Sequence, residues 1–279
     1  MLVEANQQAV HTEPSVAPAA TYEDLANFVA LSLADATLTE GQVFAGCEQA
    51  RQLGLSQVLA RPSDVDLAAK WVAPGPCQLA CLTGYPGGSS TTPARLYESR
   101  DILRRGVRDL VVTINVGKLV SRKFLYLESE LLQLAENCRQ FDAQLRILLE
   151  IEDLQQDHVL IGIRLCKRTA VNGMDLLFRR AGAEYQGGVA RYVLHHAKGK
   201  LSVSVHSPTV SLEHALALRT LGVRRVVTPQ AEKLLAAWRS ELERREQEAK
   251  EREEKIQADL QPSSDATVHP RDVEIPETR

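Results

Sequence analysis

Residues 144–178 read QLRILLEIEDLQQDHVLIGIRLCKRTAVNGMDLLF, and this stretch decides the fold class. Its first part, Gln144 to Ile151, has the apolar character of a buried strand, and its last part, Asp175 to Phe178, repeats that character. Between them, Gln155 to Asn172 spaces its apolar side chains as an amphipathic helix does, and Gly173 follows the predicted helix end. A strand, a helix and a second strand in this order indicate a βαβ unit of a parallel sheet.

This alternation recurs along the chain from Tyr22 onward. Strands are predicted at Phe28 to Leu33, Gln57 to Ala60, Gln78 to Thr83, Asp109 to Asn115, Gln144 to Ile151, Asp175 to Phe178, Leu201 to His206 and Arg224 to Thr228. Helices are predicted at Glu40 to Leu53, Ser63 to Val72, Thr92 to Arg105, Lys123 to Phe141, Gln155 to Asn172 and Leu212 to Leu221. Helix-boundary signals include Thr39 before Glu40, and Gly54, Gly106, Gly173 and Gly222 just past predicted helix ends. Eight such units close into a barrel more readily than they extend an open sheet, so we predict an α/β protein with one (β/α)8 TIM barrel. Its site is expected at the C-terminal ends of the strands.

The two ends of the chain differ in composition from the predicted barrel, which spans residues 22–236. Residues 1–21 mix Ala, Pro, Gln and Glu without periodicity, and we expect a flexible arm there. Residues 237–257 place acidic and basic side chains four positions apart, as in Glu241 and Arg245, which predicts a charged, solvated helix. A continuous apolar stripe is missing from it, which favours a plain extension over a coiled-coil partner helix. Residues 258–279 are expected to be disordered.

Composition bounds the class of protein. Of 279 residues 44% are hydrophobic and 25% charged, with 33 Lys and Arg against 36 Asp and Glu, which is the balance of an ordinary soluble globular protein. No nucleic-acid partner is expected, and neither a leader peptide nor a membrane-spanning run is visible. The five cysteines are predicted to be free, buried thiols in a cytoplasmic protein. Cys77 and Cys81, on one predicted strand, would lie about 13 Å apart, too far to hold one zinc ion.

The stretch LTGYPGGSSTTPARLYES, residues 82–99, resembles the G-F-P-x-G-x-T-T-T segment after the third strand of deoxyribose-phosphate aldolases. Five further segments resemble this family in the same chain order, namely LGLSQVLARPSDVDLAAKWV, VVTINVGKL, LRILLEIEDL, CKRTAVNGMDLL and VSLEHALALRTLGVRRVVT. The resemblance covers about residues 25–235 and implies a TIM barrel related to carbon–carbon lyases. Gly84, Gly87 and Gly88 permit a tight rim loop, and the hydroxyls of residues 89–92 can cap the next helix. A structural turn and a substrate-facing loop fit these residues equally well.

The resemblance also implies which residues should carry the chemistry. The family uses a Schiff-base lysine on strand six, a second lysine on strand seven and an aspartate on strand four. With Asp175 and Gly182 in register, MDLLFRRAG places Phe178 at the first lysine. The second lysine falls on Ser204 and the aspartate on Val111. Because none of these three side chains can do the work of the residue it replaces, we predict that Schiff-base catalysis is lost.

The segments that resemble the family's phosphate cradle are altered as well. The chain reads HSPT at residues 206–209 where the family has S-G-G-I, and VTP at residues 227–229 where the family has G-T-S. A cradle needs close backbone approach and free N–H donors, and Pro208 and Pro229 each lack the donor. Phosphate binding would then depend on hydroxyl groups.

Candidate pocket residues at the predicted rim are Asn115, Lys118, Glu150, His206, Ser207 and Thr228. Lys118 has a side chain long enough to swing over the rim and replace the lost nucleophile, although a solvated lysine is the simpler interpretation. His206 and Ser207 are adjacent on a strand and should point to opposite sides, which argues against a nucleophilic pair. Neither a Ser/His/Asp order nor metal-ligand spacing is found, so no metal or cofactor is expected.

The sequence leaves three functions open. The first is a pseudoenzyme whose barrel binds a small phosphorylated sugar, a carbonyl compound or a protein partner. The second is an active aldolase or lyase on deoxyribose 5-phosphate or a related sugar phosphate, with a relocated lysine; the retained 82–99 loop, Asn115 and Glu150 support it. The third is a structural subunit of a homo-oligomer or other assembly. The simultaneous replacement of three polar groups favours the first.

Overall fold

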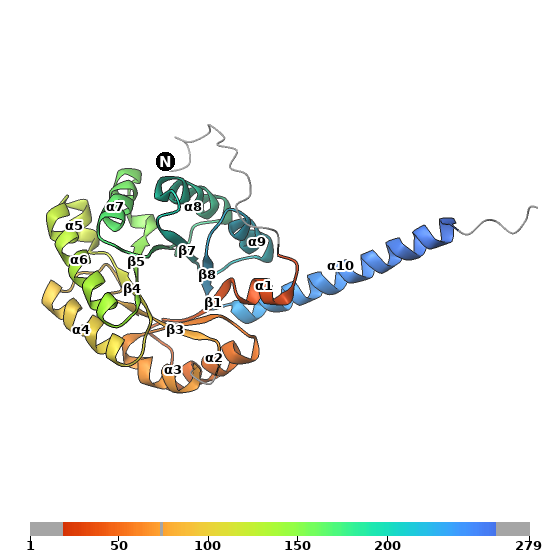
Figure 1. Cartoon of the computed structure of the whole chain (residues 1–279), viewed down its shortest axis with the longest axis horizontal. Coiled ribbons are helices and arrows are strands. Elements are labelled where there is room, and N and C mark those ends of the chain that lie inside the picture. Colours follow the sequence, from red (N-terminus) through yellow and green to blue (C-terminus); the bar gives the residue numbers. More distant parts are fainter. Residues whose placement is uncertain (1–18, 73–74, 261–279) are drawn as a thin grey trace, which may run out of the picture. The chain divides into compact units, whose positions relative to one another are not determined.

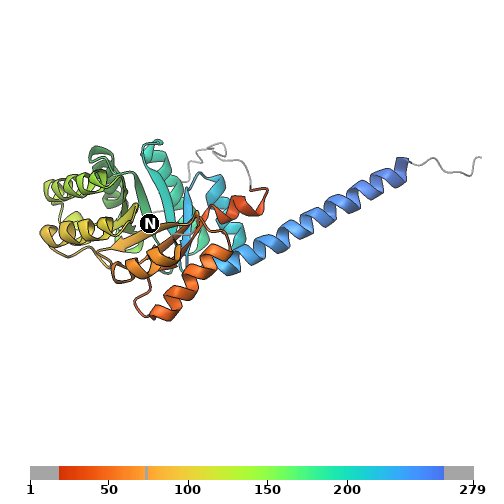
Figure 2. The same cartoon turned by 60° about the horizontal axis from the view of Figure 1, so that its bottom comes forward.

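The computed structural model describes residues 19–72 and 75–260, and eight parallel strands in it close into a barrel in chain order (Figure 1). The strands are β1 (Val29–Leu33), β2 (Gln57–Ala60), β3 (Gln78–Thr83), β4 (Asp109–Thr113), β5 (Gln144–Glu150), β6 (Gly173–Leu177), β7 (Ser202–His206) and β8 (Arg225–Thr228). Helices surround this ring on the outside (Figures 1 and 2). The predicted (β/α)8 TIM barrel is confirmed, because β8 pairs with β1 in a parallel register that leaves no sheet edge.

The helices include all six that the sequence predicts, with small differences at their ends. They are α1 (Tyr22–Ala26), α2 (Glu40–Gln52), α3 (Val65–Val72), α4 (Thr92–Arg104), α5 (Val116–Val120), α6 (Phe124–Gln140), α7 (Gln156–Arg168), α8 (Ala183–Ala197), α9 (Leu212–Thr220) and α10 (Ala231–Leu260), with 3-10 turns η2 (Pro62–Asp64) and η3 (Ile151–Asp153). The predicted helix Gln155 to Asn172 ends earlier, at Arg168, because Ala170 takes a left-handed φ of 56° that stops it. Among the elements that sequence patterns did not single out, α8 contains the pair Gly187 and Gly188, which weakens a helical pattern.

Of the four glycines predicted to follow helix ends, three do so and one does not. Gly54, Gly106 and Gly222 have positive φ just past helix ends, as expected of glycines that end helices. Gly173 does not, and begins strand β6 instead. A Cβ at Gly173 would lie 2.4 Å from Nη1 of Arg146 and 2.5 Å from Oγ of Ser202, so this glycine makes room for a buried arginine. The expectation that Gly173 ends a helix is therefore wrong.

The interior of the barrel is polar near the N-terminal ends of the strands. Gln57 donates from Nε2 to Oδ2 of Asp109 at 2.7 Å, and Arg225 donates from Nη1 to Oε1 of Gln57 at 2.8 Å. All three side chains are buried, so each needs a partner inside the protein.

An apolar layer lies further along the same strands, because side chains two residues apart share a face. Its members are Ala30, Leu59, Ala80, Leu82, Val111, Leu148 and Val227. This layer closes the barrel below the C-terminal ends of the strands, and side chains that stand above it are free to form a site.

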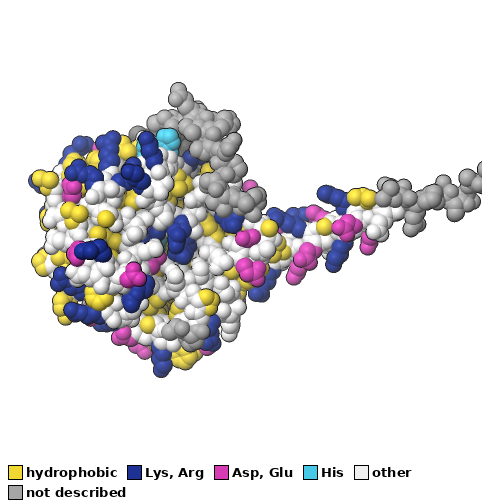
Figure 3. Space-filling view, viewed as in Figure 1, with side chains coloured by type: hydrophobic (Ala, Val, Ile, Leu, Met, Phe, Trp, Pro, Cys, Tyr) yellow, Lys and Arg dark blue, Asp and Glu magenta, His cyan; other side chains and the backbone are white. Residues whose placement is uncertain are grey.

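The chain divides into one compact unit that ends at Arg239 and a second that begins at Ser240. In the second unit, Arg245 pairs with Glu241 at 2.7 Å, as the sequence predicts, and Arg244 pairs with Glu241 at 2.9 Å. Figure 3 shows acidic and basic side chains interleaved along the part of α10 that belongs to this unit. Residues 1–18 of the predicted arm and 261–279 of the predicted tail lie outside the described residues, whereas residues 258–260 continue α10. Within 19–72 and 75–260, none of the helices is long and apolar enough to cross a membrane.

Candidate functional site

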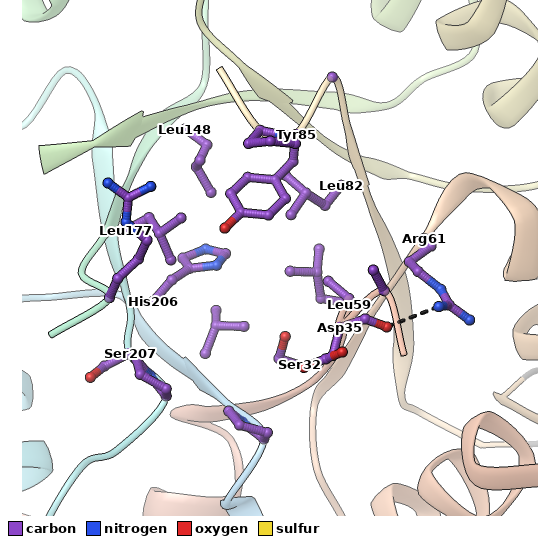
Figure 4. Close-up of a pocket in the computed structure, with 18 of the residues that line it drawn as sticks. Ser32, Asp35, Leu59, Arg61, Leu82, Tyr85, Leu148, Leu177, His206 and Ser207 are labelled. Carbon is purple, nitrogen blue, oxygen red and sulfur yellow. Dashed lines mark hydrogen bonds between the residues drawn. The ribbon is translucent and has the colours of Figure 1, made fainter. Parts of the chain in front are cut away.

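A cavity of about 900 Å³ opens at the C-terminal ends of the strands (Figure 4). Its floor is apolar and is formed by Leu59, Leu82, Leu148, Leu177 and Val227. These side chains belong to five different strands and follow the inward face of the barrel. The position is the one where TIM barrels place their sites.

One side of the floor carries a buried polar relay, which the sequence patterns did not reveal. His206 on β7 places its Nε2 2.6 Å from Oδ2 of Asp175 on β6. The other carboxylate oxygen of Asp175 accepts from Nε of Arg146 on β5 at 2.7 Å. Arg146 also donates to the hydroxyls of Ser202 and Ser204 at 2.6 and 2.7 Å. A charge buried this deeply is tolerated only with such partners, and the relay therefore fixes the orientation of His206.

The protonation of this relay follows from its geometry. Burial alone would raise the pKa of Asp175, but facing Arg146 and His206 holds that pKa well below its usual range. An ionised carboxylate only accepts hydrogen bonds, so Nε2 of His206 must carry a proton. Nδ1 is then left as the ring atom that a ligand can use, and His206 lines the cavity. Within the described residues no hydrogen bond to Nδ1 is formed.

Two arginines border the cavity, and both are engaged by the protein itself. Arg61 pairs with Asp64 at 2.6 Å and donates to the backbone oxygens of Asp35 and Leu38 at 2.9 and 3.0 Å; the dashed line in Figure 4 marks the contact with Asp35. Its guanidinium thereby joins the loop after β1 to the loop after β2. Arg61 therefore stabilises the rim of the cavity.

Arg179 occupies the other side of the rim, just after β6. It pairs with Glu150 at 3.0 Å and with Asp153 at 2.6 Å, and its Nε lies 3.7 Å from Glu152. Hydrogen bonding to Asp153 is the main reason why the pKa of Arg179 is raised, so it stays protonated. Glu152 in turn accepts from three successive backbone N–H groups, those of residues 179–181. The loop after β6 is consequently fixed to the end of β5.

The glycine-rich loop between β3 and α4 is held closely against the neighbouring strand. Gly84, Gly87 and Gly88 have positive φ values of 72°, 70° and 62°, which confirms the tight turn. A Cβ at Gly88 would lie 2.4 Å from the backbone oxygen of Ile114, so no other residue fits without movement. Thr91 takes the N-cap position of α4 but makes no capping side-chain hydrogen bond, so the expected hydroxyl cap is wrong there.

The three residues predicted to stand at the family's catalytic positions lie in different surroundings. Val111 is part of the apolar layer inside the barrel. Ser204 accepts from Arg146 in the relay. Phe178 is fully buried, with its ring edge-to-face with Tyr185 of α8 at a centroid distance of 6.2 Å. Among the described residues that line the cavity, none is a lysine.

The six candidate pocket residues separate into three groups. His206 and Ser207 line the cavity, but the Ser207 hydroxyl donates to the backbone oxygen of Thr209 at 2.7 Å and points away from His206 (Figure 4). Lys118 is exposed on α5, and its Nζ lies 5.2 Å from the ring centre of Tyr126.

The other three residues hold backbone in place. Asn115 caps α5 by accepting from the N–H of Lys118 at 3.0 Å, and Thr228 accepts from the N–H of Gln230 at 3.2 Å. Glu150 accepts from the N–H of Gly87 at 2.6 Å. None of the three lines the cavity.

Four residues of the site were not predicted from the sequence, namely Asp175 and Arg146 as partners and Arg61 and Tyr85 as cavity residues. A signal for the relay was present, since Arg146 and Asp175 each interrupt an apolar strand, and a charge inside such a strand needs an opposite charge nearby. The described residues include no group of three or more His, Cys, Asp or Glu side chains suited to a metal ion. All five cysteines are free and buried, as predicted.

Deoxyribose-phosphate aldolases are similar to this chain in sequence. That of Microcystis aeruginosa is 24% identical over 224 residues, which cover 79% of this chain and 96% of the aldolase. That of Klebsiella pneumoniae subsp. pneumoniae is 26% identical over 211 residues, covering 74% and 83%. No protein-family model matches the chain.

Solved structures support the same fold. The tetrameric deoxyribose phosphate aldolase from Aeropyrum pernix has a TM-score of 0.68 and 18% identity, and covers 79% of this chain and 93% of its own. The structure described as QR15, an aldolase, has a TM-score of 0.69 and 18% identity, with coverage of 76% and 95%. At this identity the structures establish the fold alone, while the sequence matches carry the relationship. Over most of its length, then, this chain is a distant homologue of the deoxyribose-phosphate aldolases.

Proposed function

We propose that this protein is an aldolase-like barrel that no longer forms a Schiff base and that binds a small molecule in the cavity at the C-terminal ends of its strands. The absence of lysine from the described residues that line this cavity carries the proposal. A Schiff base requires an uncharged amine beside the carbonyl carbon, and the guanidinium group of an arginine cannot take that role.

Lys118 is the candidate for a relocated nucleophile, and its surroundings speak against that role. Its ammonium group stacks on Tyr126, and its side chain is exposed on α5. Nucleophilic lysines depend on burial or on a nearby cation to lower their pKa, and an exposed lysine over an aromatic ring has no such burial. An active aldolase that uses Lys118 is therefore the alternative that the experiment must test.

Borohydride trapping tests the proposal directly. The full chain is incubated with deoxyribose 5-phosphate, and separately with acetaldehyde, then reduced and weighed by intact mass spectrometry with peptide mapping. We expect no substrate-dependent adduct, while a deoxyribose-phosphate aldolase from one of the relatives, treated in parallel, becomes labelled. The Lys118→Arg variant serves as the matched control.

An adduct on one lysine that disappears in Lys118→Arg would establish the relocated nucleophile and refute the loss of catalysis. Native mass spectrometry of the same preparation addresses the remaining alternatives. A co-purified metabolite supports a ligand-binding role, whereas a homo-oligomer or a tightly bound protein without any ligand would favour a structural subunit.

A further inference from the structure

We infer that the cavity takes an uncharged small molecule whose hydroxyl or carbonyl group hydrogen-bonds to Nδ1 of His206, and that it disfavours phosphorylated sugars. This inference rests on the proposed function, since it concerns the ligand of a site that forms no covalent bond. It departs from the sugar phosphates that the family resemblance suggests.

The cavity floor selects for an apolar body. Leu59, Leu82, Leu148 and Val227 form the upper surface of the barrel's apolar layer, and Leu177 packs against it. In Figure 4 the leucines project toward the centre of the cavity from several strands. Polar ligand groups placed on this floor would lose their water without gaining a hydrogen bond, so the deepest part of a ligand must be apolar.

His206 offers the polar contact next to that floor. It is 4% exposed and oriented by Asp175, with Nδ1 left for the ligand. A neutral imidazole with its proton on Nε2 accepts a hydrogen bond at Nδ1 from a hydroxyl, and a protonated one donates to a carbonyl oxygen. Either form suits an uncharged oxygen-bearing group, and the fixed ring reduces the entropy lost on binding.

Neither of the two arginines among the described residues that line the cavity is free to pair with a phosphate group. Arg61 is committed to Asp64 and to two backbone oxygens. Arg179 faces three carboxylates, so its positive charge is more than balanced. Carboxylates with no excess of cations around them repel a dianion.

Four other residues that line the cavity also disfavour a phosphate group. Asp35 and Glu98 are two further acidic residues at the cavity, and Pro208 and Pro229 stand where backbone N–H donors would be needed. The helix after β7 begins at Leu212, where Ser211 already caps the N–H of His214. These features together disfavour the anion-binding arrangement that a sugar phosphate requires.

Three matched probes test separately the apolar contact, the hydrogen bond to His206 and the effect of a phosphate group. Benzyl alcohol, benzyl phosphate and toluene share one apolar body and differ in the hydroxyl, the phosphate or neither. Binding to the full chain is measured by saturation-transfer NMR, with 2-deoxyribose 5-phosphate as a competitor. We expect benzyl alcohol to bind at least about tenfold more tightly than benzyl phosphate, and 2-deoxyribose 5-phosphate not to displace it.

Three variants assign the contacts. His206→Phe keeps a ring of similar shape. It should weaken the binding of benzyl alcohol by about three- to tenfold, because one hydrogen bond is lost. Toluene binding should be unchanged in that variant, which also shows that the cavity is still folded. Leu177→Trp should abolish the binding of both benzyl alcohol and toluene, because the larger side chain fills the cavity. Lys118→Ala lies outside the cavity and should change the binding of neither probe.

The inference is overturned if benzyl phosphate or 2-deoxyribose 5-phosphate binds as tightly as benzyl alcohol, if His206→Phe leaves the alcohol unaffected, or if no probe binds. Sugar phosphate bound without a borohydride adduct would refute this inference alone. An adduct would refute the proposed function instead.

Discussion

Replacing Arg146 by methionine should destabilise the protein strongly, because it leaves a buried carboxylate without its main partner. Arg146 is 1% exposed and Asp175 2% exposed, and the two are joined by a 2.7 Å hydrogen bond. Removing one member of a buried ion pair typically costs about 3–5 kcal/mol, and the hydroxyls of Ser202 and Ser204 lose their donor as well. We therefore expect Arg146→Met to lower the free energy of unfolding by about 3–5 kcal/mol at pH 7.

The loss of unfolding free energy caused by Arg146→Met should become smaller as the pH falls. The native pKa of Asp175 is lowered, so its pairing stabilises the wild type above the unfolded pKa of about 3.9 and is lost as pH falls further. In Arg146→Met, burial favours the protonated carboxyl, which carries no charge that needs a partner. The difference between the two proteins should accordingly begin to shrink above about pH 4, where the buried carboxyl of the variant takes up a proton, and should shrink further below about pH 4.

Urea unfolding followed by tryptophan fluorescence provides the assay, with the buried Trp238 as reporter. Arg122→Met is the matched control, since Arg122 is 65% exposed and pairs with Asp157 at 3.0 Å; it should cost less than about 1 kcal/mol. Adding Asp175→Leu to Arg146→Met should recover at least half of the loss. A cost below about 1 kcal/mol at pH 7, or one that grows on acidification, would refute the interpretation of this relay.

Two further predictions concern packing. Gly88→Ala should lower the free energy of unfolding by more than about 2 kcal/mol, because φ is positive at this residue and the new Cβ would meet the backbone of Ile114. Gly41→Ala is the control and should be neutral or slightly stabilising, since a Cβ there would have nothing within 4 Å. Equal melting temperatures for the two variants would contradict this prediction. The buried thiols should react slowly with Ellman's reagent at pH 8 until the protein unfolds, since burial raises the pKa of Cys47 to about 11 and of Cys166 to about 12. Rapid labelling of a thiol in the folded protein would contradict that expectation.

Much of the barrel could be predicted from the sequence, because its strands and helices are set by local patterns. The strand Gln144 to Ile151 is found as β5, ending one residue earlier, and the helix predicted from Glu40 begins there and carries the Thr39 cap. Short elements were harder. Val116–Val120 has five residues, too few to show a helical period.

The candidate site was predicted only in part. His206 lies in the cavity, as its place at the end of a predicted strand suggested. Asn115 and Glu150 lie at strand ends too, but their side chains hold loops instead of facing the cavity. Position at the rim can be read from the sequence, whereas the direction of a side chain beyond the last strand residue depends on loop geometry.

By itself, then, the sequence determined the eight strands and six of the helices that follow them, and hence the barrel, because periodicity and helix-end signals are local properties. It also led to the prediction that Phe178 stands where the resembling family has its Schiff-base lysine. Only the tertiary structure decided what surrounds the cavity. Arg146, Asp175 and His206 are about thirty residues apart from one to the next, and pairing of β5, β6 and β7 brings them into one relay. Such contacts across a parallel sheet are set by strand register and inward direction, which no local pattern encodes.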